Sequence, residues 1–586
     1  MRESLKQFKD RIGSWEGRFY LIISLLLMVV YFLLLVPTLR LGIKHIAELL
    51  LQRTINNIVW DEFLLQKRNY LVFGSLTAFI FFAIDVDAII RRIGLFLRKK
   101  GLSHKWIRVI GIVLIWSLCL ALFLRGNIQN PNFWFDESGQ FWMAKGLNHY
   151  SDPFQSSGGI RDVLENNAGF NLDPGGFTVI LHLWTLISTA PAWLRFLPMI
   201  FFLASMILVT KLSLIWHSHS PLPWFSGLLL LTLRLPSKYA LELRPYSMEM
   251  CSALLSLYYY YQTKQIIKSP KFALIAGISL GIMITSRYSA LIFPWIVVVL
   301  IFFELIQTKS SLKSLRNFGF FCFPILVSSI LILLMLHFQN PSVNPPTYVL
   351  NLTIKEGNLS QILFNLRALV VYLPFLIFIF LFFTKIKRGD FAPYRKYLVF
   401  SLFANGVFLI LSILGKYPWS FASRFDISIN ILMGISILPL LVFIVDQISL
   451  LTKQKTVWKM AFTLLLMVTI YKADSFKFPA NDSVYENILN CGITENMHGL
   501  ANINASPTIR YLFEYGPLQD VDGIYRNIDW FNDPKELLTD LDDYDYLILS
   551  HFSLSKSELD PILKARHYWV ECSNKKPSQI YLNRIK

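Results

Sequence analysis

The chain has 586 residues, of which 54% are hydrophobic and only 16% are charged, and its mean hydropathy is +0.47. A soluble protein of this length would carry more charge, so the composition excludes a soluble globular chain and indicates a polytopic membrane protein. The formal net charge is +18, yet residues 477–586 hold 16 acidic and 11 basic side chains. The positive excess therefore lies in the hydrophobic part, which is typical of membrane topology and not of a nucleic-acid-binding surface.

Apolar runs of membrane-spanning length recur through residues 1–475, where a span needs roughly 20 apolar residues. The first run, from Tyr20 to Pro37, lacks a cleavage site of small residues and is interpreted as an uncleaved signal anchor. About thirteen spans are expected, near residues 19–39, 70–90, 109–125, 195–215, 222–236, 244–262, 272–287, 289–306, 317–337, 368–384, 397–414, 427–446 and 457–473.

Lysine and arginine decide the expected orientation. The segment 91–108 carries seven of them and is expected to be cytoplasmic. With thirteen spans, the N-terminus lies on the same side as this segment and the other basic loops, which fall at 264–271, 309–316, 385–396 and 453–459. The apolar stretch 176–190 is interpreted as an interfacial helix, because a fourteenth crossing would turn the later basic loops outward.

Three regions are expected along the chain. They are two extra N-terminal helices with a basic loop (1–104), a transmembrane catalytic region with a long external loop at 126–194 (105–475), and a small external α/β domain (476–586). In the last region, helix-like residues 534–543 precede strand-like residues 544–550 and 579–585. Cys491 and Cys572 also lie there, and they either form a disulfide, if the region faces an oxidising compartment, or stay as free thiols.

The stretch "NFWFDESGQFWMAKGL" (132–147) places Asp136 and Glu137 among aromatic residues just after an apolar run. One interpretation is a helix start, with Asp136 as the N-cap, Glu137 in the first turn and Gly146 ending the helix. The other is a carboxylate at the membrane interface that accepts a proton from a substrate hydroxyl. The two are compatible, because a helix N-terminus also favours an ionised carboxylate.

Cationic residues gather at the external ends of the expected spans. Each alone is explained as an interfacial anchor, but together they favour binding of a lipid-linked phosphate, whose oxygens an arginine fork can hold. In "NLDPGGFT" (171–178), Asp173 belongs first to a turn signal and second to the same external loop as the acidic pair. The cations are Arg195, Lys238, Arg244, Arg287, Lys416 and Arg424.

The order of these motifs resembles the GT-C glycosyltransferases, specifically the protein O-mannosyltransferase and aminoarabinose transferase branch. The resemblance covers roughly residues 105–475. Its elements are "DESGQFWMAKGL", "DPGGF", "LRFLPMI" (194–200), "SKYALELRPYSMEM" (237–250), "GISLGIMITSRYSALIFP" (277–294) and "YPWSFASRFDISI" (417–429). Two features depart from the family: Asp173 stands where its "HPPL" stretch has His, and two extra spans precede the usual first one.

The resemblance implies a GT-C-type fold and an inverting transfer of a sugar from a polyprenyl-phosphate donor to a hydroxyl acceptor. The reaction would take place at the external face of the cytoplasmic membrane. Asp136 would be the general base, and Glu137 would orient the acceptor or share that role. The residues implied or considered for the lipid phosphate are Arg195, Arg287 and Arg424, with Lys238, Arg244 and Tyr417 as second choices. Asp173 is included as a further residue of the substrate site.

The expected partners are the lipid-linked donor, a glycan, lipid or protein hydroxyl as acceptor, and membrane lipids, with no nucleic acid. No cofactor is required by the expected chemistry, and a divalent metal, Mg²⁺ or Mn²⁺, held by the external carboxylates is the alternative. Two other functions are considered: a transporter or flippase of lipid-linked saccharides, and a non-catalytic envelope scaffold. The gathering of polar residues at one face of the spans favours the enzyme.

Overall fold

The structure is a computed structural model. Besides isolated positions, it describes residues 15–33, 104–125, 127–148, 154–171, 173–217, 223–308, 311–339, 372–383, 392–414, 424–452, 468–473, 484–519, 522–531, 541–549, 569–573 and 579–584. Several expectations fall outside these residues: most of the span at 70–90, Lys416 and the helix-like stretch up to residue 540.

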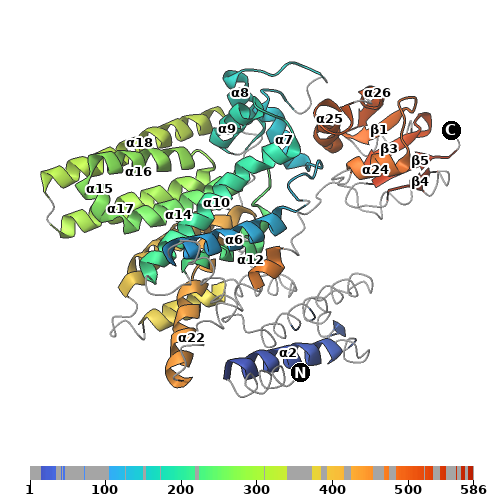
Figure 1. Ribbon diagram of the computed structural model, residues 1–586. Helices are drawn as coiled ribbons and strands as arrows, with labels where there is room; N and C mark the ends of the chain where they lie inside the picture. The colour runs from blue at the N-terminus through green and yellow to red at the C-terminus, as the bar shows by residue number, and fades with distance from the viewer. Residues whose placement is uncertain are drawn as a thin grey trace.

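Long apolar helices packed side by side form the main body of the protein (Figure 1). Helix α10 (Pro191–Trp216) packs on α14 (Tyr246–Tyr261), which also packs on α17 (Ile292–Gln307). Helix α20 (Arg395–Ile413) adds to the same core through contacts with α14 and α17. The shared interior is almost wholly apolar, with residues such as Phe293 fully buried, and it fixes the helix ends that carry the site.

Helices α16 (Pro270–Met283) and α18 (Leu312–Phe338) pack along each other. A Cβ atom built on Gly277 would lie 2.3 Å from the carbonyl oxygen of Phe321. A larger residue would therefore collide with the α18 backbone, and a small residue is what membrane helices use where they approach closely.

The expected class, a polytopic helical protein with a small C-terminal α/β domain, is confirmed. Helices α2 (Trp15–Leu33) and α6 (His104–Leu124) form where the first and third spans are expected. Among the described residues, the helical stretches long and apolar enough to cross a membrane are Pro191–Trp216, Tyr288–Gln307, Leu312–Phe338, Ala392–Ile413 and Arg424–Val445.

The span expected at residues 222–236 does not form one helix. Three short pieces occupy it, and they are α11 (Pro223–Ser226), α12 (Leu229–Thr232) and α13 (Arg234–Lys238). Pro236 lies in the first turn of α13, where it cannot donate the backbone hydrogen bond that would continue a helix from α12. The segment is instead buried, with Leu230 fully inaccessible, so apolarity here reflects packing inside the protein.

Three helices of the loop at 126–194 gather at one end of the bundle (Figure 1). They are α7 (Phe135–Ala144), α8 (Ile160–Phe170) and α9 (Gly176–Thr185). Helix α9 has ten residues, about half of what a span needs, in keeping with the expected interfacial helix. Beyond its end, Leu186 and Ile187 are 67% and 69% exposed.

The C-terminal domain is built on a five-stranded mixed sheet in the order β2-β1-β3-β5-β4. β1 pairs in parallel with β2 and β3, and β5 pairs antiparallel with β3 and β4. The strands β3 and β5 lie where the sequence predicted them. The elements are α24 (Val484–Cys491), β1 (Gly499–Asn502), α25 (Ser506–Glu514), α26 (Asp522–Arg526), β2 (Ile528–Phe531), β3 (Tyr546–Leu549), β4 (Trp569–Glu571) and β5 (Gln579–Asn583).

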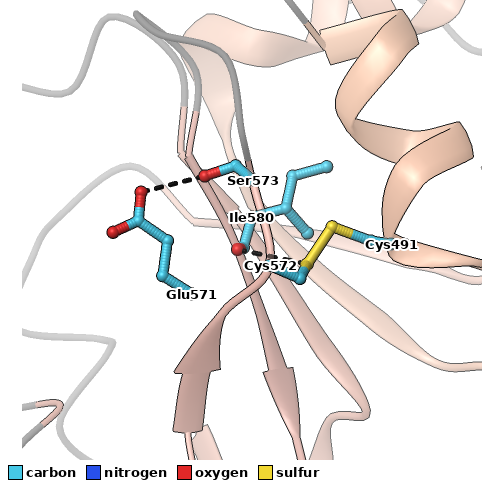
Figure 2. Close-up of a disulfide and its surroundings, with 5 residues drawn as sticks. All are labelled: Cys491, Glu571, Cys572, Ser573 and Ile580. Carbon is cyan, nitrogen blue, oxygen red and sulfur yellow. Dashed lines mark hydrogen bonds between the residues drawn. A yellow bond between two sulfur atoms is a disulfide. The ribbon is translucent and has the colours of Figure 1, made fainter.

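A disulfide joins Cys491, at the end of α24, to Cys572, just after β4 (Figure 2). The Cys572 amide also donates to the Ile580 carbonyl on β5 at 3.0 Å. Of the two alternatives left open by the sequence, the structure has the disulfide. The bridge ties a helix to the edge of the sheet across 81 positions of sequence.

Replacing both bridge residues, Cys491→Ser with Cys572→Ser, should lower the free energy of unfolding of this domain by about 2–4 kcal/mol, because the unfolded chain gains freedom. Thermal melting with and without reductant measures the effect, and reductant should shift only the wild type. Alkylation of denatured, unreduced protein taken directly from cells should modify only Cys119, Cys251 and Cys322. Modification of all five cysteines would show that the bridge does not form.

Candidate active site

Helix α7 presents the acidic pair at its start. Trp134 is the N-cap residue, and the Glu137 side chain accepts a hydrogen bond from the Trp134 amide at 3.4 Å. The expectation that Asp136 caps the helix is therefore wrong: Asp136 lies within the first turn, so its carboxylate is left for other partners. Gly146, with φ of +69°, follows the helix end as expected.

One face of α7 meets two arginines. Asp136 and Gln140 are four residues apart and so lie on the same side of the helix. Arg424 donates to Asp136 Oδ2, and Arg244 donates to Gln140 Oε1 at 3.2 Å. The Asp136 side chain is 20% exposed and that of Arg424 is 32% exposed, so a ligand can reach this ion pair.

Glu137 faces away from Asp136 and is buried. Its carboxylate lies 3.6 Å from Arg195 Nη2 and accepts the Leu243 amide at 2.9 Å. Arg195, at 0% exposure, also donates to the carbonyl oxygens of Asn130 and Asn132. No ligand can reach Glu137 or Arg195 in this arrangement, and the pair instead ties α7 to α10 and to the segment that precedes α7.

A second buried glutamate lies near Glu137. Burial and the Glu137 carboxylate raise the pKa of Glu242 to about 8, while Arg244 opposes the shift. Its Oε1 atom has no hydrogen-bond partner. Burial also raises the pKa of Glu137, although Arg195 and the Leu243 amide oppose that shift. Burial therefore favours the protonated form of the Glu242 carboxyl group.

Asp173 lies between Arg244 and a further arginine, Arg287. Its carboxylate lies 3.2 Å from Arg287 Nε and 3.7 Å from Arg244 Nη2. Arg287 also donates to Glu249 at 2.7 Å, and Ser289 donates to the other oxygen of Glu249. Asp136, Asp173 and Glu249 thus each face a guanidinium group, so these arginines are charge-compensated by carboxylates of the chain itself.

Aromatic rings hold the arginines in place. The guanidinium groups of Arg287 and Arg424 lie 5.4 Å and 5.5 Å, respectively, from the centre of the Phe425 ring. Arg287 also lies 5.0 Å from Tyr246, and Arg424 lies 5.4 Å from Trp134. Such contacts attract the cation and limit its hydration, so these guanidinium groups are partly desolvated in advance.

Two residues implied by the family resemblance, or considered with it, lie beside this cluster. The Tyr417 hydroxyl donates to the Phe425 carbonyl oxygen, and Ser412 donates to the Tyr417 carbonyl oxygen at 3.0 Å. Tyr417 therefore supports the segment that carries Arg424. The half-buried Lys238 has its ammonium group 5.0 Å from the ring of Tyr239.

Sequence reasoning missed three polar residues of the site. Gln140 lies four positions after Asp136, which helical spacing alone could have indicated. Glu249 interrupts the apolar helix α14, and an acidic residue in such a helix predicts a charged partner. Glu242 lies between α13 and α14 in "LELRP", where the sequence gives no sign that it is buried.

Metal binding by the acidic pair does not fit this geometry. Asp136 points to Arg424 and Glu137 to Arg195, so their oxygens do not converge on one ion. Within the described part of the chain, no group of three or more His, Cys, Asp and Glu side chains is arranged to hold a metal ion.

No protein-family model and no curated protein matches the chain. Among solved structures it is similar to ArnT, the aminoarabinose transferase of Cupriavidus metallidurans, bound to undecaprenyl phosphate. The TM-score is 0.47 and the identity 11%, over 82% of this chain and 98% of that one. It is also similar to an oligosaccharyltransferase of Archaeoglobus fulgidus in complex with zinc and sulfate, with a TM-score of 0.40 and 11% identity, over 80% of this chain and 73% of that one.

The chain is also similar to AglB of Archaeoglobus fulgidus in complex with an inhibitory peptide and a dolichol-phosphate. The TM-score is 0.40 and the identity 10%, over 82% of this chain and 75% of the AglB chain. ArnT and AglB are GT-C superfamily members. Because every TM-score here is below 0.5, the roles of residues rest on this chain's own geometry.

The pKa of Glu242 generates a prediction about stability. A protonated native state and an unfolded state that ionises near pH 4.5 make stability fall as pH rises from about 4.5 to about 8. Glu242→Gln removes the ionising group. The melting temperature of this variant minus that of the wild type should therefore increase steadily between pH 5 and pH 8. The exposed Glu165→Gln should show no such trend. A constant difference between Glu242→Gln and wild type would contradict the buried, protonated state.

Proposed function

We propose that the chain is a membrane glycosyltransferase. It transfers a sugar from a polyprenyl-phosphate-linked donor to a hydroxyl acceptor at the external face of the cytoplasmic membrane. The observation that carries this proposal is Asp136, a reachable carboxylate at a helix start, paired with Arg424, while a second partly desolvated arginine, Arg287, contacts the same Phe425 ring. A base for the acceptor and an anion site for the leaving phosphate thus lie together.

The proposed reaction is a single displacement with inversion. Asp136 takes the proton of the acceptor hydroxyl as that oxygen bonds to the anomeric carbon. The bond from the anomeric carbon to the phosphate oxygen breaks on the opposite face, and its electron pair stays on the phosphate. General base catalysis contributes about 10²–10⁴-fold, and preorganised guanidinium groups stabilise the growing phosphate charge.

The Asp136–Arg424 pair suits this chemistry because one cation can serve two anions in turn. Protonation of Asp136 removes the negative charge that Arg424 faces in the free enzyme. The leaving phosphate gains one negative charge at the same moment. Arg424 can therefore shift its interaction to the phosphate, and the total charge of the site stays constant through the step.

The side of the membrane is proposed from the disulfide. Disulfides persist in oxidising compartments and are rare in the cytosol, which supports an external C-terminal domain carrying Cys491–Cys572. The domain touches α7 directly, for example where Trp142 donates to the Pro507 carbonyl oxygen at 2.9 Å. Asp136 would then lie on the external side with it.

The exposed apolar end of α9 supports a lipid-linked substrate. Leu183, within α9, and Leu186 and Ile187, just after it, are all more than half exposed, and α9 packs directly on α7. Stacked Trp184 and Trp193, 4.2 Å apart, lie at the same place, as is typical of a membrane interface. An acyl or prenyl chain could thus lie in the outer leaflet while its phosphate reaches the arginines.

Replacing Asp136 tests the base. Asp136→Asn keeps the shape of the side chain and removes its proton affinity, so transfer should fall by at least about 10²-fold. Product is measured by mass spectrometry of cell-envelope glycans in cells that express each variant. Asp162→Asn, the same change at an exposed position of the same loop, is the control. Near-normal product from Asp136→Asn would reject the assignment.

Replacing Arg424 tests the anion site. Arg424→Gln should weaken binding of undecaprenyl phosphate by about tenfold or more, since a charged hydrogen bond is worth about 1.5–3 kcal/mol. Binding to the purified protein in nanodiscs measures this, with Arg161→Gln on the exposed face of α8 as control. Unchanged affinity in Arg424→Gln would remove this residue from the phosphate site.

A further inference from the structure

Helix α25 of the C-terminal domain packs against α7, the helix that carries Asp136. The Thr508 hydroxyl of α25 donates to the Phe133 carbonyl oxygen at 2.7 Å and lies 2.9 Å from the Ser138 hydroxyl. Ser138 in turn donates to the Trp134 carbonyl oxygen at 2.8 Å. Thr508 therefore contacts the backbone just before Asp136 and the side chain just after the acidic pair.

Buried aromatic contacts reinforce the same interface. The ring of Tyr511 lies 4.5 Å from that of Phe133 and 5.0 Å from that of Phe141. The guanidinium of Arg510 lies 4.1 Å from the ring of Trp142. All five side chains are fully buried, at 0% exposure, so helices α7 and α25 share one packed core.

The Phe133 ring also contacts the buried ion pair of Arg195 and Glu137. Arg195 lies 4.6 Å from the Phe133 ring and also holds Glu137. Thr508 fixes the carbonyl oxygen of the same Phe133. The start of α7 is thus held from two sides, by α10 through Arg195 and by α25 through Thr508, and the free side faces Arg424.

We propose that Thr508 is a positioning residue for Asp136, and that α25 is therefore a structural part of the active site. Its hydroxyl fixes the first turn of α7 so that the Asp136 carboxylate stays in register with Arg424. The catalytic part of this inference rests on the proposed function, whereas the fixing of α7 does not. A domain with no catalytic motif of its own would thereby control the geometry of the base.

Hydrogen exchange tests the fixing of α7 without any substrate. In full-length protein in nanodiscs, Thr508→Val should raise amide exchange of residues 135–140 by about three- to tenfold, the effect of one lost hydrogen bond. Thr508→Ser keeps the hydroxyl and should restore protection. Thr494→Val, the same change at an exposed position of the domain, is the matched control. Equal protection of α7 in wild type and Thr508→Val overturns the proposal.

Transfer in the same variants tests the catalytic consequence. The yield of envelope glycan per molecule of protein should fall about tenfold or more in Thr508→Val, because small misplacements of a catalytic group are costly, and Thr508→Ser should recover it. Undecaprenyl phosphate binding should stay unchanged, since the arginines are untouched. Full yield from Thr508→Val alongside an inactive Asp136→Asn overturns the positioning role. Full yield from Asp136→Asn rejects the proposed function instead, and the exchange experiment still decides whether Thr508 fixes α7.

Discussion

Glu137 and Arg195 bury a carboxylate and a guanidinium together where water reaches neither, and the surrounding structure depends on that pairing. Removing one partner of such a pair leaves an uncompensated charge and costs about 3–5 kcal/mol. The guanidinium also holds two backbone carbonyl groups of the segment that leads into α7. This pair orients α7, and the orientation sends Asp136 toward Arg424 and Gln140 toward Arg244.

Adjacent acidic residues thereby take opposite roles. Neighbouring positions on a helix point about 100° apart, so one carboxylate of the pair can be wholly buried while the other meets solvent. Glu137 is the anchor and Asp136 is the group that a substrate can reach. The two residues of the acidic pair therefore have different environments and different roles. The burial of Glu137 does not favour the interpretation from the sequence in which it shares the role of base.

Short-range patterns predicted the elements well. The turn at Asp173-Pro174-Gly175 forms, with Gly175 at φ of +90° before α9, and α9 is too short to cross the membrane. One expected span is wrong, since residues 222–236 form three short helices where hydropathy alone suggests a single one.

The site was predicted only in part, because its pairings join distant segments. Arg244, Arg287 and Arg424 lie in one cluster, and their joint binding of a phosphate stays a prediction. That each already faces a carboxylate or an amide oxygen could not be predicted, since Asp173 lies 114 positions from Arg287. The sequence suggested Arg195 as a phosphate ligand, because no local pattern reveals that Arg195 forms a buried ion pair with Glu137. Thr508 carries no motif, and only the docking of α25 on α7 gives it a place.

That docking has a consequence for biosynthesis. Ser138 and Thr508 are 370 positions apart, so α7 leaves the ribosome and enters the membrane region long before α25 exists. During that interval the aromatic face of α7 has no partner from the C-terminal domain, and contacts of such long sequence separation form late in folding. Under the proposed function, transfer would therefore begin only after the C-terminal domain has folded and α25 has docked on α7.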